Sequence, residues 1–251
     1  MPPLCAFSYL KYYIPSLRTK IVKAVIFAGG KGTRLRPITN ERPKPMVEVA
    51  GKPIAEWQIE WLKRRGINSF LFLGGYLFNV LKDYLGDGSR WGVKIDYLAE
   101  DTPLGSGGAL FNAYKSLAGE DGFLVINGDL LADFDISKLI RSDYVATIAL
   151  FPFKSPYGIV NTDGERITSF QEKPLLKDYW VNAGVVYATS GIFDYLPHPK
   201  GDLSGDAFTK LAAAGKLGGV KFPDLYFKMI DSIKDLEEAN DEVAKGMFKR
   251  S

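Results

Sequence analysis

Residues 22–37 read VKAVIFAGGKGTRLRP, and this stretch decides the fold. The apolar run from Val22 to Ala28 predicts a strand that is buried on both faces, as strands of parallel sheets are. It leads directly into a glycine-rich loop, residues 29–34. Ligands of open α/β sheets bind outside the carboxyl ends of the strands, so this loop is expected at the ligand crevice.

The chemistry of the loop favours phosphate. Gly29, Gly30 and Gly32 allow backbone N–H groups to approach an anion closely, and Lys31 and Arg34 add cationic donors. The loop lacks the Gly-Lys-Ser/Thr ending of a P-loop, and a leucine stands where a dinucleotide fingerprint has its third glycine. A plain strand-to-helix turn is the alternative interpretation.

Short apolar runs alternate with helical periods as far as residue 151, a pattern typical of parallel strands joined by crossover helices. Further strands are expected at Ser69–Leu73, Lys94–Leu98, Phe123–Ile126 and Val145–Phe151. Apolar stripes predict helices over residues 54–62 and 77–85. The sequence therefore predicts an α/β protein with a mostly parallel, Rossmann-like sheet flanked by helices.

The pattern changes after residue 151. Extended pieces are expected at Tyr157–Asn161, Arg166–Gln171 and Trp180–Ala188, separated by a Thr-Asp-Gly turn and by Pro174. We interpret them as a β extension of the sheet on the substrate side. A helix over Ile233–Met247 closes the chain, because its apolar residues keep to one face.

The expected organisation is an N-terminal extension over residues 1–20 and a single domain over residues 21–251. Within the domain, a nucleotide half is expected to end at about residue 151, and a substrate half to begin at about residue 152.

Composition narrows the classes of function. Lys and Arg number 32 against 29 Asp and Glu, which gives no argument for nucleic-acid or membrane binding. A single cysteine, Cys5, excludes an intramolecular disulfide and a cysteine-based zinc cluster, and fits a cytoplasmic location. The lone His198 lies between two prolines and is interpreted as structural. No segment has the pattern of a membrane span or a signal peptide.

Two further segments are expected to bring charge to the loop. Residues 42–46 read RPKPM, and the prolines on both sides of Lys44 suit one cation held at a defined point; a solvated loop lysine is the alternative. Asn127-Gly128-Asp129 follows an apolar run, which places a carboxylate at the carboxyl end of a central strand. Mg²⁺ is usually held by one or two carboxylates plus phosphate oxygens and water, so Asp129 is the strongest candidate ligand.

The order of these motifs resembles the sugar-nucleotide pyrophosphorylase family, the sugar-1-phosphate nucleotidyltransferases. The similar segments are GGKGTRLRP (29–37), RPKPM (42–46), GKP (51–53), PLGSGGA (103–109), NGD (127–129), YG (157–158), EKP (172–174) and NAG (182–184). The Leu-Gly-Ser-Gly-Gly segment resembles that of short mannose or heptose 1-phosphate guanylyltransferases. The resemblance implies Mg²⁺-dependent transfer of a nucleotidyl group from a nucleoside triphosphate to a sugar 1-phosphate. It further implies no left-handed β-helix domain, and it is compatible with a homo-oligomer.

The resemblance also assigns roles to residues. Catalysis is expected from Arg34, Lys44 and Asp129. Nucleotide binding is expected from Ala28, Gly29, Gly30, Gly32, Thr33, Arg34, Glu100, Gly105 and Ser106. Substrate binding is expected from Asn127, Gly158, Glu172, Lys173, Asn182 and Gly184. A sugar 1-phosphate is already an anionic nucleophile, so the protein must align and neutralise charge and needs no general base.

One position departs from the family pattern. Met229 stands where the family usually has a second metal-binding acid, and a thioether is a poor ligand for Mg²⁺. Asp231 is two residues on and would face the same way in an extended segment, so it is predicted as the replacement metal ligand. A non-catalytic regulatory homologue that binds nucleotide sugar is the alternative.

The base and the sugar are less constrained. Glu100 lies at the position that reads the base in the family; its two oxygens match the N1–H and N2–H donors of guanine, which favours GTP. The resemblance to short guanylyltransferases implies a mannose-type sugar. A carboxylate also accepts a bond from N3–H of uracil or thymine, so a uridylyl or thymidylyltransferase acting on a glucose-type 1-phosphate remains open. A cytidylyltransferase acting on a non-sugar phosphate is a third alternative.

Overall fold

The computed structural model describes residues 23–224 and 226–248. The predicted N-terminal extension over residues 1–20, with Cys5, lies outside them. The strands are β1 (Ala24–Phe27), β2 (Glu48–Val49), β3 (Lys52–Pro53), β4 (Ser69–Gly74), β5 (Lys94–Ala99), β6 (Gly122–Asn127), β7 (Leu130–Asp133), β8 (Ala146–Lys154), β9 (Ile159–Asp163), β10 (Arg166–Gln171), β11 (Leu175–Thr189), β12 (Leu217–Lys221) and β13 (Tyr226–Met229).

The helices complete the fold around these strands. The α-helices are α1 (Ile54–Arg64), α2 (Phe78–Leu85), α3 (Gly105–Asn112), α4 (Tyr114–Leu117), α5 (Thr209–Ala213) and α6 (Ile233–Ala244). Short helical turns are η1 (Thr33–Leu35), η2 (Ile38–Asn40), η3 (Lys44–Met46), η4 (Ser89–Trp91), η5 (Ile136–Leu139), η6 (Ser190–Asp194) and the π-helical η7 (Leu203–Phe208).

A seven-stranded sheet in the order β12-β8-β11-β6-β1-β4-β5 forms the centre of the molecule. β1 pairs in parallel with β4 and β6, and β4 with β5. β11 runs antiparallel to both β6 and β8, whereas β12 is parallel to β8. The predicted α/β class with a mostly parallel sheet is confirmed.

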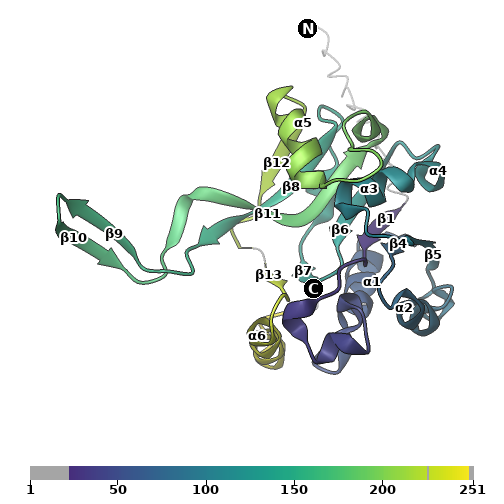
Figure 1. The fold of residues 1–251 in the computed structure, drawn as a ribbon, viewed down its shortest axis with the longest axis horizontal. Helices are drawn as coiled ribbons and strands as arrows, with labels where there is room; N and C mark the ends of the chain where they lie inside the picture. The colour runs from purple at the N-terminus through teal and green to yellow at the C-terminus, as the bar shows by residue number, and fades with distance from the viewer. Residues whose placement is uncertain (1–22, 225, 249–251) are drawn as a thin grey trace, which may run out of the picture.

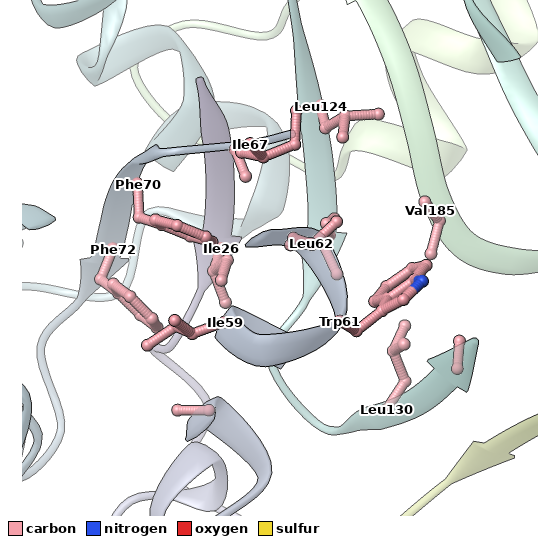
Figure 2. Packing of buried hydrophobic residues seen from close by; sticks show 14 of the residues in the cluster. Ile26, Ile59, Trp61, Leu62, Ile67, Phe70, Phe72, Leu124, Leu130 and Val185 are labelled. Carbon is pink, nitrogen blue, oxygen red and sulfur yellow. The ribbon is translucent and has the colours of Figure 1, made fainter. Parts of the chain in front are cut away.

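The sheet is buried on both faces, which explains the continuous apolar run in β1. Ala24 and Ile26 pack on one face with α1 and α2, while Val25 packs on the other with α3 and α5. Figure 2 shows Trp61 and Leu62 of α1 among these side chains. Both are fully buried, so their burial stabilises the fold by roughly 2–3 kcal/mol each.

A smaller apolar cluster fixes α6 beside the glycine-rich loop. Leu35 of η1, Ile54 and Trp57 of α1, and Leu236 and Ala239 of α6 belong to it. α6 begins with a capping box, in which the Ser232 hydroxyl and the Asp235 side chain each bond the other residue's backbone N–H. The segment before α6 is therefore held next to the loop.

Several boundaries differ from the prediction for local reasons. α2 begins at Phe78, because Leu77 has left-handed φ of 48°. α6 ends at Ala244, and Gly246 follows with φ of 70°. The predicted strand at Tyr157–Asn161 lies two residues later, as β9, and its turn includes Gly164. The β7–β13 ribbon, β12 and α3 were not expected, because contacts between distant segments create them.

The β extension is longer and more exposed than predicted. β8 and β11 continue beyond the main sheet, and β9 and β10 pair as a separate hairpin that projects far from the body (Figure 1). Among the described residues, no helix is long and apolar enough to cross a membrane.

Candidate active site

A cavity of about 600 Å³ opens at the carboxyl ends of β1, β4, β5 and β6. The sequence-predicted residues in its wall are Ala28, Gly29, Gly30, Lys44, Glu100, Gly105, Ser106, Asn127 and Asp129. They come from five separate segments of the chain. The structure thus brings together most of the residues predicted for nucleotide binding and catalysis.

The glycine-rich loop is shaped by close contacts. Gly29 lies against the Glu100 carboxylate, where a Cβ atom would collide with Oε1. Gly32 has φ of 61°, and an added Cβ would lie 2.8 Å from the Lys44 side chain. Gly32, Thr33 and Arg34 lie outside the cavity wall, so the predicted loop divides into a lining part and a flanking part.

Lys44 joins the two candidate metal ligands. Its Nζ donates a 2.9 Å hydrogen bond to Oδ2 of Asp129 and also donates to Oδ1 of Asp231. The second oxygen of Asp231, Oδ2, accepts a 2.9 Å hydrogen bond from Arg34. Lys44 begins η3 between Pro43 and Pro45, and its hydrogen bond to Asp129 holds it beside the carboxyl end of β6. Two acids and two basic side chains from four segments form one cluster.

Charge in this cluster is fixed. Burial alone would lower the pKa of the Lys44 ammonium, but Asp129 and Asp231 outweigh it, so the pKa lies above its usual value. Burial likewise opposes ionisation of Asp231, yet Lys44 and Arg34 hold the pKa of this carboxyl below its usual value. Lys44 is a cation and Asp231 an anion at neutral pH.

The cluster fits a hard divalent cation. Oδ1 of Asp129 is buried and accepts no hydrogen bond from the described residues, so one carboxylate oxygen still lacks a partner. The described residues hold no group of three or more His, Cys, Asp or Glu side chains suited to a metal. Two carboxylates completed by phosphate oxygens and water are the ligand set that Mg²⁺ takes in nucleotide sites.

Met229 and Asp231 have different surroundings. Met229 ends β13 and pairs with Leu130 of β7, and the backbone N–H of Ile230 donates to Asp129 O. The chain then turns toward α6, where Asp231 reaches Lys44. The acid at position 231 therefore lies beside Asp129, although position 229 has none.

Glu100 forms one side of the cavity. Oε2 of its carboxylate accepts a 3.2 Å hydrogen bond from the Leu104 backbone N–H, and its own N–H donates to Gly74 O. Oε1 lies next to Gly29. The carboxylate is thus oriented by the loop before α3.

The glycines around Ser106 have a structural cause. Gly105, Gly107 and Gly108 pack against residues 197–202, and the N–H of Gly107 donates a 2.9 Å hydrogen bond to Gly201 O. Ser106 donates to the Asp202 carboxylate at 2.8 Å and accepts from the Leu203 N–H.

Asp202 and Ser204 also line the cavity, although neither was predicted from the sequence. Hydrogen bonds from the Gly205 N–H and from Ser106 hold the pKa of Asp202 below its usual value. No motif marks these two residues, because only folding brings them to a segment about a hundred positions earlier.

A second, smaller space of about 40 Å³ adjoins the main cavity. Asn127, Asn182 and Gly184 line it, and Ser106 and Ser204 line both spaces. Asn182 accepts a hydrogen bond from the Gly184 N–H, and Gly184 has φ of 67°. Three of the predicted substrate residues therefore meet at this point.

The other three predicted substrate residues lie elsewhere. Gly158 precedes β9 and packs against the Phe170 ring, so it belongs to the projecting hairpin. Glu172 and Lys173 follow β10, are exposed, and form an ion pair of 3.7 Å with each other. None of them lines either cavity.

His198 has a packed position, which is consistent with its interpretation as a structural residue. Its ring packs on Phe111 with centroids 4.5 Å apart, and it is absent from the cavity wall.

Comparison with known proteins gives a family match over most of the chain. The family model described as Nucleotidyl transferase matches residues 23–246. A D-glycero-α-D-manno-heptose 1-phosphate guanylyltransferase of Campylobacter jejuni is 37% identical over 69% of this chain and 78% of its own length. A UTP–glucose-1-phosphate uridylyltransferase of Synechocystis is 34% identical to 77% of this chain. The match covers only 56% of the length of that relative.

Solved structures agree with the fold. A crystal structure of HddC from Yersinia pseudotuberculosis superposes with a TM-score of 0.71 and 30% identity, over 88% of this chain and 99% of that one. A second structure of HddC, complexed with GMP-PN, covers the same shares with a TM-score of 0.68 and 27% identity.

Proposed function

Because the chain belongs to the nucleotidyl transferase family and is an enzyme of that family, we propose that it transfers a nucleotidyl group from a nucleoside triphosphate to a sugar 1-phosphate, releasing pyrophosphate. The observation that carries the proposal is the cluster of Lys44, Asp129 and Asp231 beside the glycine-rich loop. Such a cluster supplies both cationic charge for phosphates and carboxylates for a metal.

The proposed reaction requires no general base. The phosphate oxygen of the sugar 1-phosphate attacks the α-phosphorus and displaces pyrophosphate. Gly29 and Gly30 line the cavity, where their backbone N–H groups would bind the phosphates, and Lys44 and Arg34 would offset the charge that develops on the leaving group. The lone histidine outside the cavity is consistent with this route.

Asp129 and Asp231 are the proposed Mg²⁺ ligands, with Asp231 replacing the family's usual acid at position 229. Mg²⁺ would neutralise charge on the phosphates and help to align them. Lys44 donates hydrogen bonds to both carboxylates in this structure. When metal and nucleotide bind, Lys44 would exchange some of these hydrogen bonds for bonds to phosphate oxygens.

GTP is the proposed nucleotide. The Leu104 N–H donates to Oε2 of Glu100 and holds the carboxylate in the cavity wall, where it would accept hydrogen bonds from the N–H groups of guanine. The relative named as a heptose 1-phosphate guanylyltransferase supports this choice, whereas the uridylyltransferase relative keeps UTP as the alternative.

The proposed sugar is a mannose-type 1-phosphate, bound where Asn127, Asn182 and Gly184 line the smaller space. The manno configuration in the name of the heptose relative supports it. The roles of Gly158, Glu172 and Lys173 in sugar binding stay predictions, since these residues lie on the hairpin side.

A substrate panel tests the proposal. Pyrophosphate release would be measured with GTP, UTP, dTTP and CTP, each combined with mannose, glucose and manno-heptose 1-phosphates and with phosphocholine. We expect the highest kcat/KM for GTP with a manno-configured 1-phosphate. Turnover of CTP with phosphocholine alone would favour the cytidylyltransferase reading. Nucleotide-sugar binding without turnover of any pair would contradict the enzymatic proposal and favour a regulatory homologue.

A further inference from the structure

Gln58 is a polar residue on the buried face of α1. It is 1% exposed, and its neighbours Trp57, Ile59, Trp61 and Leu62 are buried apolar residues. A helix that covers a sheet normally presents apolar side chains at such positions. The Oε1 atom of Gln58 is also buried and accepts no hydrogen bond from the described residues. A buried amide with an unpaired oxygen costs stability, so packing alone does not explain a glutamine here.

The amide nitrogen of Gln58 has two partners. Nε2 donates a 2.8 Å hydrogen bond to the backbone carbonyl oxygen of Asn127 and a 2.9 Å hydrogen bond to that of Leu130. Carbonyl oxygens only accept hydrogen bonds, so the nitrogen of the amide, and not its oxygen, must face them. Both hydrogens of the NH₂ group are therefore used.

The two carbonyl groups lie on either side of the turn that carries Asp129. β6 ends at Asn127 and β7 begins at Leu130, so only Gly128 and Asp129 lie between the two strands. β6 belongs to the seven-stranded sheet, whereas β7 pairs with β13 in a separate ribbon. One amide group thus joins the sheet to the ribbon across this turn.

Other contacts confine the turn from different sides. A Cβ atom added to Gly128 would collide with the carbonyl oxygen of Phe27, so the backbone there lies against the end of β1. The carbonyl oxygen of Asp129 accepts a 2.8 Å hydrogen bond from the Ile230 N–H, and its Oδ2 accepts one from Lys44. Gln58 supplies the contact from α1, and it holds the backbone directly before and directly after the turn.

The position of this turn matters for the metal. Mg²⁺ demands near-ideal octahedral geometry, with oxygen ligands about 2.0–2.1 Å away. Oδ1 of Asp129 lacks a partner among the described residues, and it can share a metal with Asp231 only if the turn keeps its place. Replacing a residue that orients a metal ligand typically changes metal affinity by about 10-fold to 100-fold.

We propose that Gln58 is a positioning residue of the active site. By bonding the carbonyl groups of Asn127 and Leu130, it fixes the turn from which Asp129 binds the metal. Gln58 lines neither cavity, so it acts through the turn and touches neither substrate nor metal. This inference rests on the function proposed above, in which Asp129 is a metal ligand.

Calorimetric titration of the full chain with GTP, once in EDTA and once at a fixed Mg²⁺ concentration, tests the proposal. Without a sugar 1-phosphate the proposed reaction cannot proceed, so both titrations measure binding. Gln58→Met keeps the length of the side chain and removes both donors. It should weaken GTP binding by about 10-fold to 100-fold with Mg²⁺, but by less than about 2-fold in EDTA. If wild type binds only UTP, the same titrations use UTP.

A second variant and a matched control accompany Gln58→Met. The amide of Gln58→Asn is one methylene too short to reach both carbonyl oxygens, so this variant should also weaken nucleotide binding selectively with Mg²⁺. Ile59→Val changes the next residue of α1, which is also buried, without removing a hydrogen bond, and should keep both binding constants. In pyrophosphate release, Gln58→Met should need about 10-fold more Mg²⁺ for half-maximal rate.

The outcomes separate this inference from the proposed function. A folded Gln58 variant that binds nucleotide with Mg²⁺ as wild type does, or that loses binding equally in EDTA, would overturn the role of Gln58 alone. Failure of both variants to unfold cooperatively on heating would assign Gln58 to stability and would also overturn it. A wild-type protein that binds neither GTP nor UTP would overturn the proposed function, and this inference with it.

Discussion

The cavity and the projecting arm, residues 154–179, both carry predicted site residues. The contacts that position these residues differ between the two regions. In the cavity, Lys44, Asp129 and Asp231 come from separate segments and contact one another directly. On the arm, Glu172 and Lys173 are neighbours in the chain and bond only each other among the ion pairs of the described residues. A motif thus predicts a functional residue in both regions, but only in the cavity does packing bring the predicted residues into contact with one another.

The largest effect is expected in the cavity. Asp129→Ala should lower kcat by about 10³-fold or more, since it removes the proposed main metal ligand, while thermal unfolding should stay near that of wild type. Asp143→Ala, at an exposed acid paired with Arg141, is the control and should keep full activity. A normal rate of pyrophosphate release for Asp129→Ala at saturating Mg²⁺ would rule out this ligand.

Asp231→Asn tests whether the acid has moved from position 229. We expect a loss of about 10²-fold in kcat and a higher Mg²⁺ concentration for half-maximal rate, because asparagine retains the shape but lacks the charge. A near-normal rate with an unchanged Mg²⁺ requirement would instead indicate a site with one protein carboxylate.

Glu100→Gln concerns the opposite wall of the cavity. The substitution replaces one acceptor by a donor, so the ratio of kcat/KM for GTP to that for UTP should fall by about 10-fold. The measurement is pyrophosphate release with each nucleotide at fixed sugar 1-phosphate. An unchanged ratio would show that another residue reads the base.

Lys173→Ala tests whether a residue on the arm binds the sugar 1-phosphate. If the residue meets the 1-phosphate in the working enzyme, as its motif predicts, KM for the sugar 1-phosphate should rise by about 5-fold to 10-fold with KM for the nucleotide unchanged. Equal KM values would confine sugar recognition to Asn127, Asn182 and Gly184. Lys177→Ala, also exposed on the arm, is the matched control.

The smallest effect concerns stability and pH. The folded state lowers the pKa of Asp231, so its ion pairs stabilise the protein above the ordinary carboxyl pKa of about 3.9 and lose this contribution as pH falls through the lowered pKa. The free energy of unfolding in urea should be higher for wild type than for Asp231→Asn at pH 7, by at most about 1 kcal/mol. The difference should shrink as pH falls through the lowered pKa; a constant difference would contradict the assignment.

Prediction from sequence succeeded where a local pattern has one physical meaning. The apolar run before Gly29 forms β1, and the stripe through Trp61 forms α1, because burial on a sheet requires these periods. It failed for β7 and β13, whose pairing joins residues about a hundred positions apart. It also misplaced the start of β9, because no hydrophobic period defines the bounds of this exposed strand.

The sequence alone was enough to predict the family, the α/β class and about half of the cavity wall, because glycines, prolines and acids at strand ends have constrained uses. Tertiary structure alone decided three matters: that Asp231 reaches Lys44 and Asp129, that Asp202 joins Ser106 in the wall, and that the EKP motif lies on an exposed arm. These depend on where separate segments meet in space, and hydrogen bonds of about 3 Å between such segments leave no trace in local sequence patterns.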